Sequence, residues 1–264
     1  MKGNRERNIV ITGLASLFTD VSSEMIYPII SLYLRALGGG PFILGTIEGI
    51  AESTASLLKV FSGAIADWSG KRKPLTILGY ALSLLGKALF YFAHGWPTIL
   101  GGRFADRFGK GIRTAPRDAM ISESVSLQAQ GKAFGLHRTF DTLGALLGVL
   151  ITYFFVAQIQ QKAAASKELA LYLPTFRFII FLSLIPATLG VLVLFFALET
   201  GTGNKMNPTF SFRLHPIQRL NHKLKVFLLV TLIFTLGNSS NQFILLRAAE
   251  PDIGLSPKNV ILLY

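Results

Sequence analysis

Long apolar runs alternate with short polar connectors along the chain. Six runs before residue 199 and one after residue 225 are each long enough for a membrane-spanning helix, because about 20 mostly apolar residues cross the hydrocarbon core of a bilayer. The predicted helices occupy approximately residues 8–37, 42–66, 74–94, 98–115, 133–157, 174–198 and 226–246, and an eighth run begins before Tyr264. The pattern therefore predicts an all-α polytopic membrane protein with seven complete helices and the start of an eighth.

Turn-forming and polar residues separate these runs. Residues 38–41 and 95–97 contain Gly and Pro, which interrupt helices and mark turns. Residues 200–225 form a longer basic linker without Asp or Glu. We therefore divide the chain into a six-helix unit (1–199), this linker (200–225) and a second helical segment (226–264).

Composition agrees with a membrane protein and excludes several other classes. The chain is 51% hydrophobic and 15% charged, whereas soluble domains are about 25% charged. A net charge of +12 would suggest nucleic acid as the partner of a soluble protein, but most of the cations cluster in short connectors, so we expect no nucleic-acid partner. The chain has no Cys, and its four His are scattered. We expect neither an enzyme nor a metal or organic cofactor.

The distribution of cations predicts the orientation in the membrane. Alternate connectors fall on opposite sides, and the side that holds the N-terminus and the linker has more than twice as many Lys and Arg as the other. Lys and Arg are enriched in cytoplasmic loops. The N-terminus is therefore predicted to be cytoplasmic.

The connector between the second and third runs contains a specific motif. It has the pattern Gly-x-x-x-Asp-x-x-Gly followed by three cations, and comprises Gly63, Asp67, Gly70, Lys71, Arg72 and Lys73. The pattern resembles the loop signature of the major facilitator superfamily of secondary transporters, where it joins the second and third helices. The resemblance implies a latch that bridges the cytoplasmic ends of neighbouring helices. We expect Asp118 to pair with Arg72.

The fourth helix carries a second, less complete resemblance to that superfamily. Arg107, Gly111 and Ala115 match the signature Arg-x-x-Gln-Gly-x-Gly-x-Ala, whereas Lys110 and Arg113 depart from it. In the family this arginine is often tied to proton coupling, so the resemblance implies that role for Arg107.

The fifth helix contains Gly144 and Gly148, four residues apart. Small residues at this spacing allow two helix backbones to approach closely, so a packing role is expected. The pair also resembles the antiporter signature Gly-x-x-x-Gly-Pro, but Val149 replaces the proline.

Many ionisable residues fall within the predicted spans. They are Asp20, Glu24, Glu48, Glu52, Lys59, Lys87, Arg103, Asp106, Arg107, Arg138 and Asp141. Each charge costs about 2.5–3.5 kcal/mol at the bilayer centre, so most must face one another or a wet cavity. Several are spaced four apart and share a helix face.

We expect carboxylates of helices 1 and 2 to meet arginines of helix 4, and in part helix 5, around one cavity. The candidate transport and proton-coupling residues are Asp20, Glu24, Glu48, Glu52, Arg103, Arg107, Arg138 and Asp141. Lysines at positions 59 and 87 are weaker candidates, because a lysine can extend toward the interface.

The resemblance implies transport of a small solute by alternating access, with a proton as coupling ion, in a prokaryotic plasma (inner) membrane. It also implies twelve helices, so the chain is expected to be a fragment or a natural truncation of a protein that is monomeric when full length. Its partners would be the lipid bilayer and a small-molecule substrate. Substrate and direction stay open. The alternatives are a channel, a receptor-like protein or non-transporting scaffold, and an inactive fragment.

Overall fold

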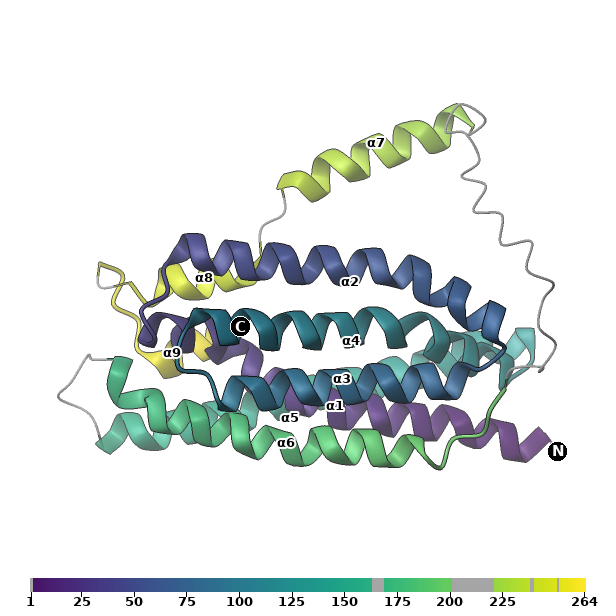
Figure 1. Cartoon of the computed structure of the whole chain (residues 1–264), viewed down its shortest axis with the longest axis horizontal. Helices are drawn as coiled ribbons and strands as arrows, with labels where there is room; N and C mark the ends of the chain where they lie inside the picture. The colour runs from purple at the N-terminus through teal and green to yellow at the C-terminus, as the bar shows by residue number, and fades with distance from the viewer. Residues whose placement is uncertain (1, 163–168, 201–220, 238–239, 251) are drawn as a thin grey trace.

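A computed structural model describes residues 2–162, 169–200, 221–237, 240–250 and 252–264. Within these ranges the chain is helical and contains no β-strand. Six long helices form one bundle (Figure 1): α1 (Lys2–Ala36), α2 (Pro41–Ser69), α3 (Arg72–Tyr91), α4 (Trp96–Glu123), α5 (Gln130–Lys162) and α6 (Leu173–Leu194). Single 3-10 turns, Leu127–Ala129 and Leu169–Tyr172, precede α5 and α6.

Three shorter helices follow the bundle. They are α7 (His222–Gly237), α8 (Asn241–Ala248) and α9 (Pro257–Leu263). In Figure 1, α7 lies apart from the bundle, whereas α8 and α9 lie at the end of the bundle opposite the N-terminus. There α9 contacts α5 and α1, and α8 contacts α1 and α2.

The bundle is organised by two sets of contacts. One set joins α4 to α2 and α3, and the other joins α1 to α5 and α6. The main apolar core has its largest share of buried residues from α1 and includes Ile29, Leu32, Phe176 and Ile179, all fully buried. Contacts between α3 and α6 connect the two sets.

Glycines allow the closest helix approaches. An added Cβ at Gly86 of α3 would lie 2.5 Å from the carbonyl oxygen of Gly102 in α4. In α5, an added Cβ at Gly144 would lie 2.5 Å from the carbonyl oxygen of Leu17 in α1, and one at Gly148 would lie 2.5 Å from that of Val21. Real Cβ atoms do not approach oxygens this closely, so any side chain here would push the helices apart.

Four stretches have both the length and the apolar composition of a membrane span. They are Arg7–Ala36, Arg72–Tyr91, Leu127–Ile159 and Leu173–Leu194. Helix α6 shows the outer face of such a span, because Phe178, Phe181, Ile185, Leu189 and Leu192 recur every three or four residues and are all exposed. The helices α2 and α4 are 29 and 28 residues long but are not among these four stretches.

Several helix ends differ from the prediction. α4 continues to Glu123 instead of ending near residue 115, and α6 ends at Leu194 instead of residue 198. The predicted helix 226–246 was wrong as a single element, because α7 ends at Gly237 and α8 starts anew at Asn241. The Ser240 side chain caps α8 by accepting a hydrogen bond from the backbone N–H of Gln242. The predicted linker lies mostly in 201–220, outside the described residues.

Candidate functional site

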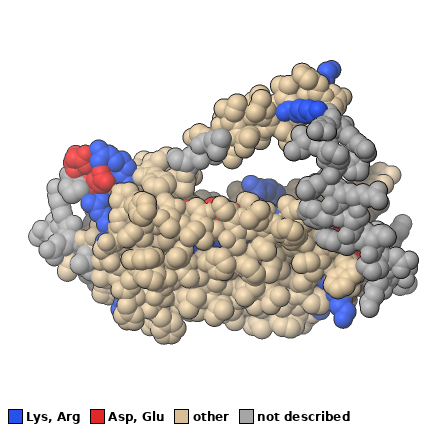
Figure 2. Space-filling view, turned by 45° about the horizontal axis from the view of Figure 1, so that its top comes forward, with Lys and Arg blue, Asp and Glu red and all other residues tan. Residues whose placement is uncertain are grey.

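Charged side chains of α1, α2, α4 and α5 line two adjoining cavities, with α3 contributing one lysine to the smaller. The larger has a volume of about 430 Å³ and the smaller about 50 Å³. Asp20, Glu24, Lys110 and Arg113 line both. Figure 2 shows a mainly tan surface with Lys or Arg, and a little Asp or Glu, inside the hollow between α7 and the bundle. The bundle therefore keeps charge inside and presents few charged residues on the face seen here.

Helix α4 supplies most of the cations, and its sequence explains their alignment. Its cations Arg103, Arg107, Lys110, Arg113 and Arg117 recur at intervals of three or four, and Asp106 directly precedes Arg107. Residues at this spacing share one face of a helix. All six line one cavity or the other.

Two ion pairs join α2 to α4. The guanidinium of Arg103 donates to both carboxylate oxygens of Glu48, at 2.7 and 3.0 Å, and each side chain is only 4% exposed. Arg107 lies 3.1 Å from Glu52, whose side chain is 51% exposed. Both guanidinium groups also lie over the ring of Tyr27, at 4.6 Å for Arg103 and 5.7 Å for Arg107. The structure thus brings together the predicted residues of helices 2 and 4.

The acids of α1 lie at the cavities but are not paired with arginine. Asp20 forms no ion pair among the described residues, and Glu24 accepts a hydrogen bond from the hydroxyl of Tyr264. This differs from the prediction that helix 1 carboxylates would meet arginines of helix 4. Arg103 and Arg107 of α4 are already paired with carboxylates of α2, namely Glu48 and Glu52.

The predicted residues of α5 interact mainly with each other. Asp141 lies 3.5 Å from His137 and 3.9 Å from Arg138 on its own helix. The side chain of Arg138 is 83% exposed. Both residues still line the larger cavity, but neither forms an ion pair with α1, α2 or α4 among the described residues.

Four cations of the cavities have no carboxylate within ion-pair distance among the described residues. Lys87 is 1% exposed and donates to the carbonyl of Thr19, 3.2 Å away. Arg113 donates to the hydroxyl of Ser83 and lies 4.3 Å over the Tyr80 ring. The side-chain amines of the other two, lysines 59 and 110, form neither a hydrogen bond nor an ion pair among the described residues. Sequence reasoning omitted Lys110 and Arg113 from the site, although both depart from the family signature.

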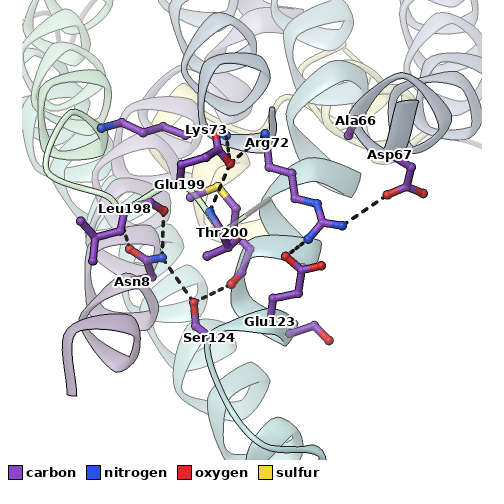
Figure 3. A network of polar contacts seen from close by, with 12 residues as sticks. Asn8, Ala66, Asp67, Arg72, Lys73, Glu123, Ser124, Leu198, Glu199 and Thr200 are labelled. Carbon is purple, nitrogen blue, oxygen red and sulfur yellow. Dashed lines mark hydrogen bonds and ion pairs between the residues drawn. The ribbon is translucent and has the colours of Figure 1, made fainter. Parts of the chain in front are cut away.

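The α2–α3 loop holds Arg72 between two acids (Figure 3). Gly70 ends α2 with a φ of 63°, a conformation that favours glycine, and its N–H donates to the Ala66 carbonyl. Arg72 pairs with Asp67 at 3.4 Å and with Glu123 at the end of α4. The predicted partner, Asp118, instead pairs with Arg117 at 2.9 Å. Glu123 was missed because the sequence placed it in a loop; the extension of α4 brings it to the α2–α3 connection.

A second acid from far along the chain caps α3. The carboxylate of Glu199 accepts from the backbone N–H of Arg72 at 3.0 Å and of Lys73 at 3.2 Å (Figure 3). Lys73 Nζ donates to the carbonyl of Phe195, at 2.7 Å. Glu199 thus satisfies two of the amides that a helix start leaves free, and no local signal in the sequence pointed to it.

The other motif residues of the loop have smaller roles in the structure. An added Cβ at Gly63 would lie 3.5 Å from Ala115 of α4, an ordinary contact distance. Lys71 is exposed, and its backbone N–H donates to the hydroxyl of Ser69.

The sequence profile of the Major Facilitator Superfamily matches residues 12–264. The chain belongs to this superfamily. It is 36% identical over 244 residues to an uncharacterized MFS-type transporter of Methanocaldococcus jannaschii, a match that covers 92% of this chain and 57% of the relative. It is 30% identical to the multidrug resistance protein MdtH of Cronobacter sakazakii over 48% of this chain and 32% of that protein.

Solved structures of the superfamily share the fold. The crystal structure of a POT family transporter in complex with 5-aminolevulinic acid superposes with a TM-score of 0.63 at 14% identity, over 96% of this chain and 49% of that one. The chain thus spans about half the length of the superfamily members it matches. Membership and the apolar helices together make it an integral membrane protein of a transporter superfamily.

Proposed function

We propose that this chain provides the first half, and the start of the second, of a transporter that moves a small solute by alternating access. The observation that carries the proposal is the charged cavity between α1, α2, α4 and α5 in a chain of this superfamily. Ionisable residues within membrane spans usually mark a transport pathway. The cavity also lies among the helices that the superfamily fold arranges around a central site.

We propose that α2 and α4 cross the membrane together with the four apolar spans. Most of their charged residues line the cavities or pair with each other, so their outer faces can still contact lipid. On α2, Leu57, Val60 and Phe61 are all exposed. The first half would then consist of six spans, α1 to α6.

The orientation follows from the cations at one end of the bundle. The start of α1, the α2–α3 loop and the end of α6 meet at that end (Figure 1), and the loop carries Lys71, Arg72 and Lys73. The preference of cations for the cytoplasmic side supports a cytoplasmic N-terminus. We propose the plasma (inner) membrane of a prokaryote as its location, which is supported by the similarity to a relative from Methanocaldococcus jannaschii.

Proton coupling is supported by the different exposure of the two α2–α4 ion pairs. The Glu48 side chain is 4% exposed, whereas that of Glu52, beside Arg107, is 51% exposed. A proton that reaches Glu52 would neutralise it and release Arg107 to interact elsewhere. This release is a local change of the kind that can bias one transport state over another.

The test is proton movement in proteoliposomes that contain the longest polypeptide encoded by the gene. An enclosed pH dye would report proton movement while pools of metabolites and drugs are added outside. In the wild type we expect proton movement that depends on one of the pools. In Arg107→Ala the rate of this proton movement should fall at least about tenfold. Arg247→Ala is the matched control, since Arg247 lies in α8 and its side chain is 57% exposed. Equal activity of Arg107→Ala and the wild type would contradict the assignment of Arg107.

A further inference from the structure

The larger cavity carries an excess of positive charge. Its ionisable lining comprises three carboxylates, Asp20, Glu24 and Asp141, and five cations, Lys59, Lys110, Arg113, Arg117 and Arg138. The lining comes from α1, α2, α4 and α5, so the excess belongs to the space between helices and not to one helix. A cavity with low-dielectric walls concentrates the field of such charges.

Some of these lining side chains already form ion pairs or hydrogen bonds within the protein. Asp141 is held by His137 and Arg138, and Glu24 accepts the hydrogen bond from Tyr264. Arg117 is paired with Asp118 outside the cavity lining. Asp20 is therefore the remaining carboxylate of the lining without a hydrogen bond or ion pair among the described residues.

Three cations remain against the carboxylates of Asp20 and Glu24, because the neutral Tyr264 hydroxyl does not cancel the charge of Glu24. Lys59 of α2 and Lys110 of α4 have no ion pair among the described residues, and Arg113 contacts only the neutral Ser83 hydroxyl and the Tyr80 ring. Lys110 and Arg113 are three residues apart on one face of α4. Even when Asp20 and Glu24 balance two of them, one positive charge of the lining lacks a counter-charge among the described residues.

We propose that this cavity is the binding site for a small organic anion whose carboxylate or phosphate group contacts Lys110 and Arg113. Lys59 closes the site from α2, and the guanidinium of Arg113 supplies the fork of donors that matches a carboxylate or phosphate. The volume of about 430 Å³ lies within the range of small-ligand pockets, about 300–1,000 Å³. That this anion is also the cargo rests on the proposed function.

Thermal unfolding of the longest encoded polypeptide in detergent tests the site without requiring transport. The test ligands are the organic anions succinate and glycerol 3-phosphate. Chloride and the organic cation tetraphenylphosphonium, added at equal ionic strength, are the controls. A ligand that binds only the folded state raises the midpoint of unfolding as its concentration rises. We expect saturable stabilisation by at least one of the two anions, and none by tetraphenylphosphonium.

Substitutions locate the binding. Lys110→Gln should raise the dissociation constant at least about tenfold, because a hydrogen bond to a charged group contributes about 1.5–3 kcal/mol. Lys110→Arg keeps the charge and should retain binding, which separates loss of the site from loss of the fold. Lys132→Gln, at an exposed position outside the cavity lining, is the matched control and should leave binding unchanged.

The outcomes separate this proposal from the proposed function. Absence of stabilisation by both anions, stabilisation by tetraphenylphosphonium alone, or equal anion affinity in Lys110→Gln and wild type would each overturn the anion site. Coupled transport of an uncharged or cationic solute would refute the anion site as the cargo site but would support the proposed transport function. Anion binding that depends on Lys110, without movement of any solute, would support the site and refute transport.

Discussion

Glu48 and Arg103 form the most buried ion pair of the described residues, and its removal gives a prediction that can be worked out from the structure. Glu48→Gln keeps the shape of the side chain but leaves the guanidinium of Arg103 without its main counter-charge. Removal of one partner of a buried pair costs about 3–5 kcal/mol. Asp106 remains 3.9 Å from Arg103, so we expect the lower end of that range, about 3 kcal/mol.

The neighbouring pair provides a matched control. Glu52→Gln removes a carboxylate from the same face of α2, one helical turn away, but the Glu52 side chain is 51% exposed. Exposed ion pairs contribute about 0–1 kcal/mol. The two substitutions therefore make the same chemical change at different burial, and their losses should differ by about 2 kcal/mol or more.

The free energy of unfolding can be measured by titration with sodium dodecyl sulfate in mixed micelles, with helix content followed by circular dichroism. The double variant Glu48→Gln/Arg103→Met should lose less than the sum of the two single variants, because it leaves neither charge unpaired. Equal losses for Glu48→Gln and Glu52→Gln would refute the reasoning that burial determines the strength of these pairs.

Two further predictions concern helix packing and the α2–α3 loop. Gly86→Ala should lower the free energy of unfolding by about 1–3 kcal/mol, since its Cβ would lie 2.5 Å from the Gly102 carbonyl oxygen; Gly101→Ala, with nothing within 4 Å, should be neutral or stabilising in the same titration. Arg72→Glu should lower the free energy of unfolding by up to about 1 kcal/mol. Adding Glu123→Arg should restore most of that loss in the same titration. Absence of any recovery would show that the Arg72–Glu123 ion pair does not stabilise the loop.

Helix ends were predictable where glycine or proline makes the turn. α1 ends at Ala36 and α2 begins at Pro41, each one residue from its predicted boundary. The end of α4 was not predictable in this way, because Pro116 and the polar residues after it are typical of a loop. Pro116 removes only one backbone hydrogen bond of the helix, and the polar side chains beyond it find partners in Ser16 of α1 and in the α2–α3 loop. The helix therefore continues.

Part of the site could be predicted from spacing alone. The four-residue intervals placed Glu48 and Glu52 on one face of α2, opposite matching arginines of α4, as the structure has them. The same rule did not predict that Asp141 would lie beside His137, four residues earlier on its own helix. Partners far along the chain, such as Tyr264 for Glu24, leave no local pattern and require the fold itself.

The capping of α3 by Glu199 also sets an order of events during synthesis. The first amides of α3 and their acceptor are separated by 127 residues, and Pro74 at the third position has no N–H to satisfy. At about 5–20 residues per second, the ribosome adds Glu199 roughly 6–25 s after Arg72. Until then the start of α3 has no carboxylate cap. Glu199 joins the residues after α6 to the start of α3, so this contact can form only after α6 has been synthesised.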